Sequence, residues 1–134
     1  MRVFLDSNII IYYIEEHPYF FRKVYHYFDQ ALEGRITLVT SDISYIETFI
    51  PVLRKKRYDL IDKYDTIFTE ICEFVNTDKT EEITEKAKYF IYKYNLKEYD
   101  AMQISAAIYS NCDKFVTADK KLTRVKEIKI ELIK

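Results

Sequence analysis

Four carboxylates stand beside apolar runs at positions where they could do chemistry. Asp6 follows Val3–Leu5 and precedes three isoleucines, and the others are Glu47, Asp100 and Asp119. Burying a charged carboxylate costs free energy unless something pairs with it. Each has a simpler explanation when taken alone: Asp6 and Asp119 as helix caps, Asp100 beside a helix dipole, and Glu47 in a capping box with Ser44.

Taken together, the four acids predict a site for a divalent cation. Carboxylates that converge without cations repel one another and raise their own pKa values. No Lys or Arg stands next to Asp6, Glu47 or Asp100 in the sequence as an obvious partner. A bound divalent metal ion would remove the repulsion, and hard oxygen ligands favour Mg²⁺ or Mn²⁺.

The surrounding elements predict how these side chains are positioned. Short apolar runs alternate with segments of helical spacing, which is typical of an α/β sandwich with a mostly parallel sheet and helices on both faces. The predicted strands cover residues 2–6, 36–41, 72–76, 114–119 and 129–133. Ligands of such sheets bind beyond the carboxyl ends of the strands. Asp6 and Asp119 should therefore emerge at the same edge.

Three helix boundaries can be predicted from residues that favour the start of a helix or interrupt it. Ser41 and Asp42 are typical helix-start residues, and Pro51 should bend or end the helix that follows. Asp78 or Thr77 should start a later helix that runs to about residue 94, because Glu81 lies three residues after Asp78 as in a capping box.

Composition excludes several classes of protein. A chain of 134 residues is expected to form one domain over 1–134, and its net charge of −1 gives no global attraction to nucleic acid. The one glycine excludes glycine-rich phosphate loops, and no apolar run is long enough to span a membrane. The N-terminus does not resemble a signal peptide, and two distant cysteines suit a reducing compartment, so we expect a cytoplasmic protein.

Four stretches together resemble the PIN domain family over nearly the whole chain. They are LDSN at 5–8, SYIET at 44–48, YDAMQISAA at 99–107 and FVTADKKL at 115–122. The chain is most similar to the small VapC-like toxins of toxin–antitoxin pairs. The resemblance implies a three-layer α/β/α sandwich and metal-dependent endoribonuclease activity on RNA. It also implies roles for particular residues: a catalytic, metal-binding quartet of Asp6, Glu47, Asp100 and Asp119, supported by Asn8 and Thr117.

Binding of RNA also needs positive charge beside the acids, because the quartet repels phosphate when no metal is bound. The best candidates are Lys120, Lys121 and Arg124, which directly follow Asp119, and the basic run at 54–57 is a second candidate. Both runs could instead be solvated helix faces. The resemblance further implies that an aromatic second helix helps to bind an antitoxin segment and that the chain forms a homodimer.

Other functions remain open at this level. The chain could be a PIN-like RNA-processing nuclease without an antitoxin, or a non-catalytic RNA- or protein-binding module on the same fold. A phosphoryl-transfer receiver also carries acids at strand ends, but receivers usually show paired acids near the first strand, where this chain has only Asp6. The sequence does not decide between one and two metal ions.

Overall fold

The computed structural model describes every residue from Met1 to Lys134. Five short strands form one sheet in the order β3-β2-β1-β4-β5, and every neighbouring pair is parallel. The strands are β1 (Arg2–Leu5), β2 (Thr37–Ser41), β3 (Cys72–Val75), β4 (Lys114–Thr117) and β5 (Lys129–Leu132). The predicted α/β class is confirmed, and the sheet is wholly parallel.

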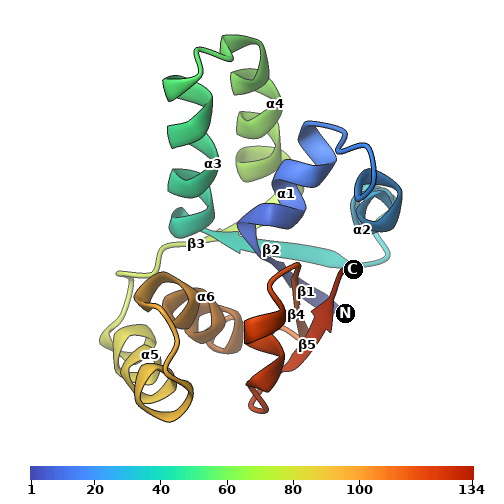
Figure 1. The fold of residues 1–134 in the computed structure, drawn as a ribbon. Coiled ribbons are helices and arrows are strands. Elements are labelled where there is room, and N and C mark those ends of the chain that lie inside the picture. The colour runs from blue at the N-terminus through green and yellow to red at the C-terminus, as the bar shows by residue number, and fades with distance from the viewer.

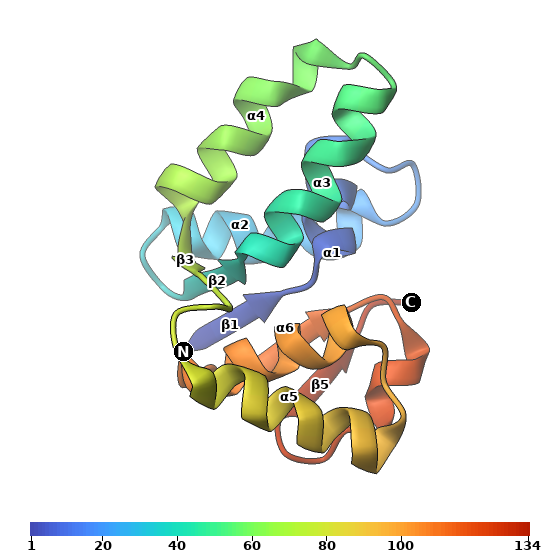
Figure 2. The same ribbon diagram turned by 90° about the vertical axis from the view of Figure 1, so that its left-hand side faces the viewer.

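Helices cover both faces of this sheet and give three layers. Figure 1 shows α1 to α4 on one side of the sheet and α5 and α6 on the other, and Figure 2 shows the same layers after a quarter turn. The helices are α1 (Ser7–Ile14), α2 (Phe21–Leu32), α3 (Asp42–Arg54), α4 (Ile61–Thr66), α5 (Glu81–Tyr94) and α6 (Glu98–Tyr109), with short helical segments η1 (Tyr58–Leu60), η2 (Ile67–Ile71) and η3 (Lys120–Arg124). No helix has the length and apolar character needed to cross a membrane.

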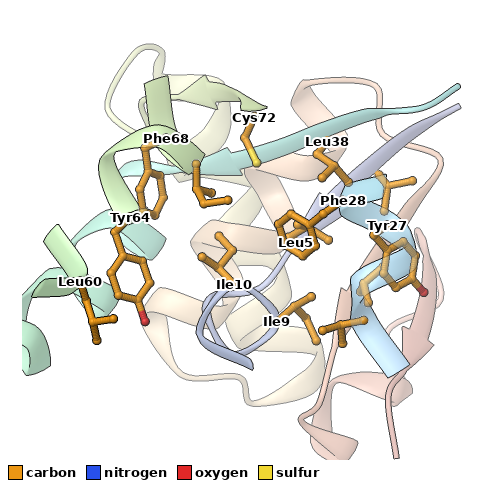
Figure 3. Packing of buried hydrophobic residues seen from close by; sticks show 14 of the residues in the cluster. Leu5, Ile9, Ile10, Tyr27, Phe28, Leu38, Leu60, Tyr64, Phe68 and Cys72 are labelled. Carbon is orange, nitrogen blue, oxygen red and sulfur yellow. The ribbon is translucent and has the colours of Figure 1, made fainter. Parts of the chain in front are cut away.

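Two hydrophobic cores lie on opposite faces of the sheet because successive strand residues point in opposite directions. In β1, Val3 and Leu5 join the core under α1 to α4, whereas Phe4 joins the core under α5 and α6. Phe4 stacks on Phe115 of β4, with ring centroids 5.2 Å apart. Figure 3 shows the first core, where Phe28 of α2 and other apolar side chains meet Leu5. The two cores hold the strand ends, and hence Asp6, in place.

The structure corrects the expectation that Pro51 could end its helix. Ser41 caps α3 as predicted, through its Oγ accepting from the N–H of Ile43 at 3.2 Å, but the helix passes Pro51 and continues to Arg54. Proline lacks an N–H and disfavours helix interiors. The last turn persists because Val52 is buried in the core.

The predicted start of α5 is also wrong. The helix is capped by Thr80, whose Oγ1 accepts from the N–H of Glu82 at 3.2 Å, and not by Thr77 or Asp78. Thr77 is used elsewhere: its N–H and hydroxyl donate to the Asp42 carboxylate at 2.9 and 3.1 Å. Thr77 thus ties the end of β3 to the first residue of α3.

Candidate active site

Asp6 lies at the end of β1, where the chain turns from strand into α1. Its Oδ1 accepts from the N–H of Ser7 at 2.8 Å, which caps α1, and its Oδ2 accepts from the Thr117 hydroxyl at 2.7 Å. Its backbone N–H donates to the carbonyl of Val116 at 3.0 Å, which ties the first helix turn to β4. The residue is only 6% exposed and forms no ion pair with any lysine or arginine. Asp6 is therefore a capping residue and also a buried carboxylate without a cation.

The surroundings of Asp6 favour its protonated form. Burial raises its pKa from 3.8 to about 6, because the charged form loses the solvation of water. The hydrogen bonds from Thr117 and Ser7 oppose this rise, and the negative charges of Asp100 and Glu47 add to it. A cation placed beside this carboxylate would therefore be strongly stabilised.

The Ser7 hydroxyl connects Asp6 to Glu47. Its hydroxyl donates to Glu47 Oε1 at 2.8 Å and lies 3.4 Å from Asp6 Oδ1. Glu47 is exposed, one turn inside α3, so the alternative capping box with Ser44 does not form. Ser7, and not Asn8 as predicted, supports the carboxylates in this structure. Asn8 is exposed, and no hydrogen bond joins it to the four carboxylates. The apolar stripe of α1 could have indicated this, because Ser7 lies one turn before the buried Ile10 and so faces inward.

Thr117 links Asp6 to Asp119. While its hydroxyl donates to Asp6, its Oγ1 accepts from the N–H of Asp119 at 3.0 Å. Asp119 in turn accepts from the N–H of Lys121 at 2.9 Å and caps η3, so Asp119 is also a helix cap, as the simpler explanation predicted. One buried hydroxyl at the end of β4 therefore holds two of the predicted acids in fixed relation.

Asp100 reaches the same edge of the sheet from the opposite layer. The far end of α6 contacts the start of β1, where the carbonyl of Ser110 accepts from Arg2 Nε at 2.9 Å, so the first turn of α6 lies toward the carboxyl ends of the strands. The pKa of Asp100 is raised, first by burial and then by the charges of Asp119 and Glu47. Lys97 is among the cations that oppose this rise. The structure thus brings all four predicted acids within electrostatic reach of at least one other.

A small cavity of ≈ 110 Å³ lies between Asp100 and Asp119. Two of the predicted cations, Lys121 and Arg124, line it, whereas Lys120 is exposed and lies outside the lining. Lys97, which the sequence reasoning missed, also lines it. Positive charge is therefore placed directly beside two of the acids.

The second predicted basic run is less close to these acids. Arg57, its last residue, forms an exposed ion pair with Asp59 at 3.0 Å. The run begins at Arg54, the last residue of α3, whereas Glu47 lies near the first turn of that helix. None of its residues lines the cavity beside Asp100 and Asp119.

The donor atoms at this edge suit a hard divalent cation. As the side chains stand, no three His, Cys, Asp or Glu residues lie close enough to hold one ion together. The chemistry of the set nevertheless fits Mg²⁺ or Mn²⁺, since it consists of carboxylates and hydroxyls. None of the four acids takes part in an ion pair, although Lys97 and Lys121 lie close enough to Asp100 to lower its pKa.

The fold and this edge together define a class: a parallel α/β/α sandwich with unpaired acids at the carboxyl ends of β1 and β4. The PIN domain family model matches residues 3–128, and the chain belongs to that family. No curated protein is detectably similar in sequence.

Solved structures with the same fold include several toxin–antitoxin assemblies. VapBC2 from Rickettsia felis, bound to a promoter DNA fragment, superposes with a TM-score of 0.77 at 23% identity and covers 98% of each chain. A toxin–antitoxin complex from Klebsiella pneumoniae gives a TM-score of 0.71 at 20% identity over 94% of each chain. VapBC-1 from nontypeable Haemophilus influenzae gives a TM-score of 0.69 at 19% identity over 98% of each chain. At these identities the similarity establishes the fold.

Proposed function

We propose that this PIN domain is a Mg²⁺- or Mn²⁺-dependent endoribonuclease that hydrolyses RNA phosphodiesters, and that it is a VapC-like toxin of a toxin–antitoxin pair. The observation that carries the proposal is Asp6: a buried carboxylate with a raised pKa, two neutral hydrogen-bond donors and no cation. Family membership and the toxin–antitoxin assemblies among the structural neighbours support it.

The four acids would hold the cation. When bound, a divalent cation lowers the pKa of water and neutralises the negative charge that develops on the phosphate. Asp6 is the central ligand of this proposal, and Ser7 and Thr117 orient its two oxygens. Glu47 is exposed and its carboxylate accepts a single side-chain hydrogen bond, so it can turn toward the edge and orient the attacking water. Thr117 keeps Asp119 in register with Asp6.

The cationic side of the cavity would hold the RNA backbone. Lys97, Lys121 and Arg124 line the space next to Asp100 and Asp119, and they can neutralise phosphates on either side of the bond to be cleaved. Lys120 is exposed on the same turn and would contact a phosphate outside the cavity. The proposed substrate is therefore an RNA whose backbone passes across this edge.

The test is incubation of single-stranded RNA with the protein and Mn²⁺, with an EDTA control. Asp6→Asn should abolish cleavage, because it removes the central charge and keeps the shape. Asp59→Asn is the matched control, since this carboxylate is exposed and pairs with Arg57 far from the site. Cleavage that persists in Asp6→Asn would refute the role of the quartet. Failure of the wild type to bind Mn²⁺ would favour a non-catalytic binding module on the same fold.

An apolar groove supports the antitoxin part of the proposal. It measures ≈ 390 Å³, lies between α1, α2 and the α4–η2 segment, and is lined by Tyr13, Ile14, Glu16, Phe21, Lys63, Thr66, Ile67 and Ile71. An apolar protein segment could bury its side chains there. A small reading frame directly upstream that encodes a DNA-binding head and a hydrophobic tail would support the pairing, and co-purification of its product would test it. Without such a partner, an RNA-processing nuclease is the better interpretation.

The proposed homodimer would use an exposed apolar stripe on α3. Ile46, Ile50 and Leu53 are between 42% and 52% exposed and lie three and four residues apart, so they share one face of the helix. A second copy of the chain would cover this face. Sedimentation of the wild type beside an Ile50→Arg variant tests it.

A further inference from the structure

Gln103 is a buried polar residue that the proposed mechanism does not use. It lies on α6 and is 1% exposed, although an amide in a protein interior is costly unless it is hydrogen-bonded. Its amide is satisfied across the molecule: Nε2 donates to Ser44 Oγ at 2.7 Å, and Oε1 accepts from the Ser41 hydroxyl. Ser41 is the last residue of β2 and caps α3, and Ser44 lies in the first turn of α3, in the opposite helical layer (Figure 1).

Each end of this bridge lies one turn from a proposed metal ligand. Gln103 follows Asp100 by three residues on α6, and Ser44 precedes Glu47 by three residues on α3. Residues three apart on a helix lie on the same side, one turn from each other. A shift of either helix at the bridge would therefore move the attached carboxylate by a similar amount.

The bridge also controls how α3 begins. Ser41 caps the helix by accepting from the N–H of Ile43 at 3.2 Å, and the same hydroxyl donates to Gln103. All of these side chains are fully buried or nearly so, and no buried side-chain nitrogen or oxygen in the structure lacks a partner. A buried polar network that is fully satisfied fixes one arrangement, because a shifted helix would leave polar atoms unpaired.

We propose that Gln103 is a positioning residue that sets the backbone position of Glu47 relative to that of Asp100 by locking the first turn of α3 to α6. This inference rests on the proposed function for its catalytic consequence. The Gln103 amide, which is outside the acidic quartet, would thus connect two proposed ligands, Glu47 and Asp100, that come from opposite layers of the sandwich. Residues that hydrogen-bond a metal ligand directly commonly change metal affinity by about 10- to 100-fold when they are replaced, and Gln103, which acts through the helix backbone, should lie near the lower end of this range.

The chain offers a matched control on the same helix. Ser105 is fully buried, and its hydroxyl donates to the carbonyl of Ile83 at 2.6 Å, which ties α6 to α5 and not to α3. Ser105→Ala therefore removes a buried hydrogen bond of α6 without touching the bridge. Gln103→Met keeps the length of the side chain and removes both of its hydrogen bonds, and Ser44→Ala removes only one acceptor and serves if the methionine variant does not fold.

The test compares Mn²⁺ affinity by titration calorimetry with kcat and KM for RNA. Gln103→Met should bind Mn²⁺ at least about 10-fold more weakly and lose kcat to a similar degree, with KM for RNA nearly unchanged. Ser44→Ala should change in the same direction by less. Ser105→Ala should lower thermal stability but leave Mn²⁺ affinity within about twofold of wild type. A Gln103→Met protein that loses stability but binds Mn²⁺ like wild type would overturn the proposal.

A metal-free measurement separates this inference from the proposed function. In amide spectra of the protein without metal, Gln103→Met should shift the signals of both Glu47 and Asp100, whereas Ser105→Ala should leave that of Glu47 in place. If the wild type neither binds Mn²⁺ nor cleaves RNA, the proposed function fails, and these spectra alone decide on Gln103. Unchanged Glu47 and Asp100 signals in Gln103→Met would refute the positioning role of Gln103.

Discussion

Replacing Asp6 by asparagine is expected to stabilise the metal-free protein while it abolishes activity. The pKa of Asp6 is raised from 3.8 to about 6, mainly by burial. One pKa unit corresponds to about 1.36 kcal/mol, so the ionised carboxylate destabilises the folded state by about 3 kcal/mol above pH 6. Asparagine removes this cost. Because its Nδ2 must replace an oxygen that accepts from Thr117, about 1 kcal/mol of hydrogen bonding is lost, and a net gain of about 2 kcal/mol remains.

The effect has a defined dependence on pH. A carboxyl group whose pKa is higher in the folded state stabilises that state at low pH and loses this contribution as the pH rises. For wild type without metal, the loss should fall between about pH 4 and pH 6. The advantage of Asp6→Asn should therefore be full at pH 8, shrink as the pH falls through 6, and vanish or reverse near pH 4.

Urea unfolding in EDTA at pH 8, 6 and 4 measures the difference in unfolding free energy between Asp6→Asn and wild type directly. In thermal scans, about 2 kcal/mol corresponds to a rise of roughly 6 °C for a domain of this size. Mn²⁺ at about 100 times its Kd should raise the stability of wild type by about 2.7 kcal/mol and leave that of Asp6→Asn unchanged. A variant that is less stable than wild type at pH 8 in EDTA would show that the charge of Asp6 is already compensated within the chain, which would refute the reasoning.

A carboxylate with the opposite environment provides the control. Burial would raise the pKa of Glu127, but hydrogen bonds from Tyr94, Lys93 and Tyr89 outweigh it and lower the pKa to about 2. Glu127→Gln should therefore destabilise the protein at pH 8, and this loss should fade only in strong acid. The same chemical change is thus expected to act in opposite directions at the two sites.

Three further perturbations have expected outcomes. Thr117→Val removes the donor to Asp6 and should cost about 1–2 kcal/mol by urea unfolding and weaken Mn²⁺ binding in calorimetry. Lys121→Ala should weaken RNA binding and reduce the slope of log affinity against log salt by about 0.7 for each phosphate that is no longer neutralised, measured by fluorescence anisotropy; an unchanged slope would remove this lysine from the RNA-binding surface. Ile50→Arg should convert a sedimenting dimer to monomer without changing the melting temperature by more than a few degrees, and a monomeric wild type would contradict the proposed dimer.

The amino-acid pattern was sufficient to predict the architecture because short strand-like segments, of which β1 and β4 are nearly all apolar, alternate with segments of helical spacing. Alternation in β1 assigns Val3 and Phe4 to different cores without further information. Boundaries that depend on tertiary contacts could not be predicted in the same way. Thr77 has the chemistry of a helix cap, yet it bonds Asp42, a residue 35 positions earlier in the chain.

The site was predictable where a residue's place follows from a strand end, and less so where it follows from packing between layers. Asp6 and Asp119 come at the ends of predicted strands, so their shared edge could be inferred from the amino-acid pattern alone. Lys97 and Gln103 could not be found in this way, because their roles depend on contacts with distant segments. Lys97 lines the cavity beside Asp119, and Gln103 bonds the start of α3.

The two interpretations of Asp6, as a helix cap and as a metal ligand, are compatible. Capping uses Oδ1 through the N–H of Ser7, and Oδ2 accepts from Thr117, so both oxygens have donors. Those donors are neutral, and they reduce the cost of the buried charge without removing it, which is why the pKa stays raised. A cap alone would be served equally well by asparagine or serine at this position. The aspartate is therefore better explained by a cation that the chain itself does not supply.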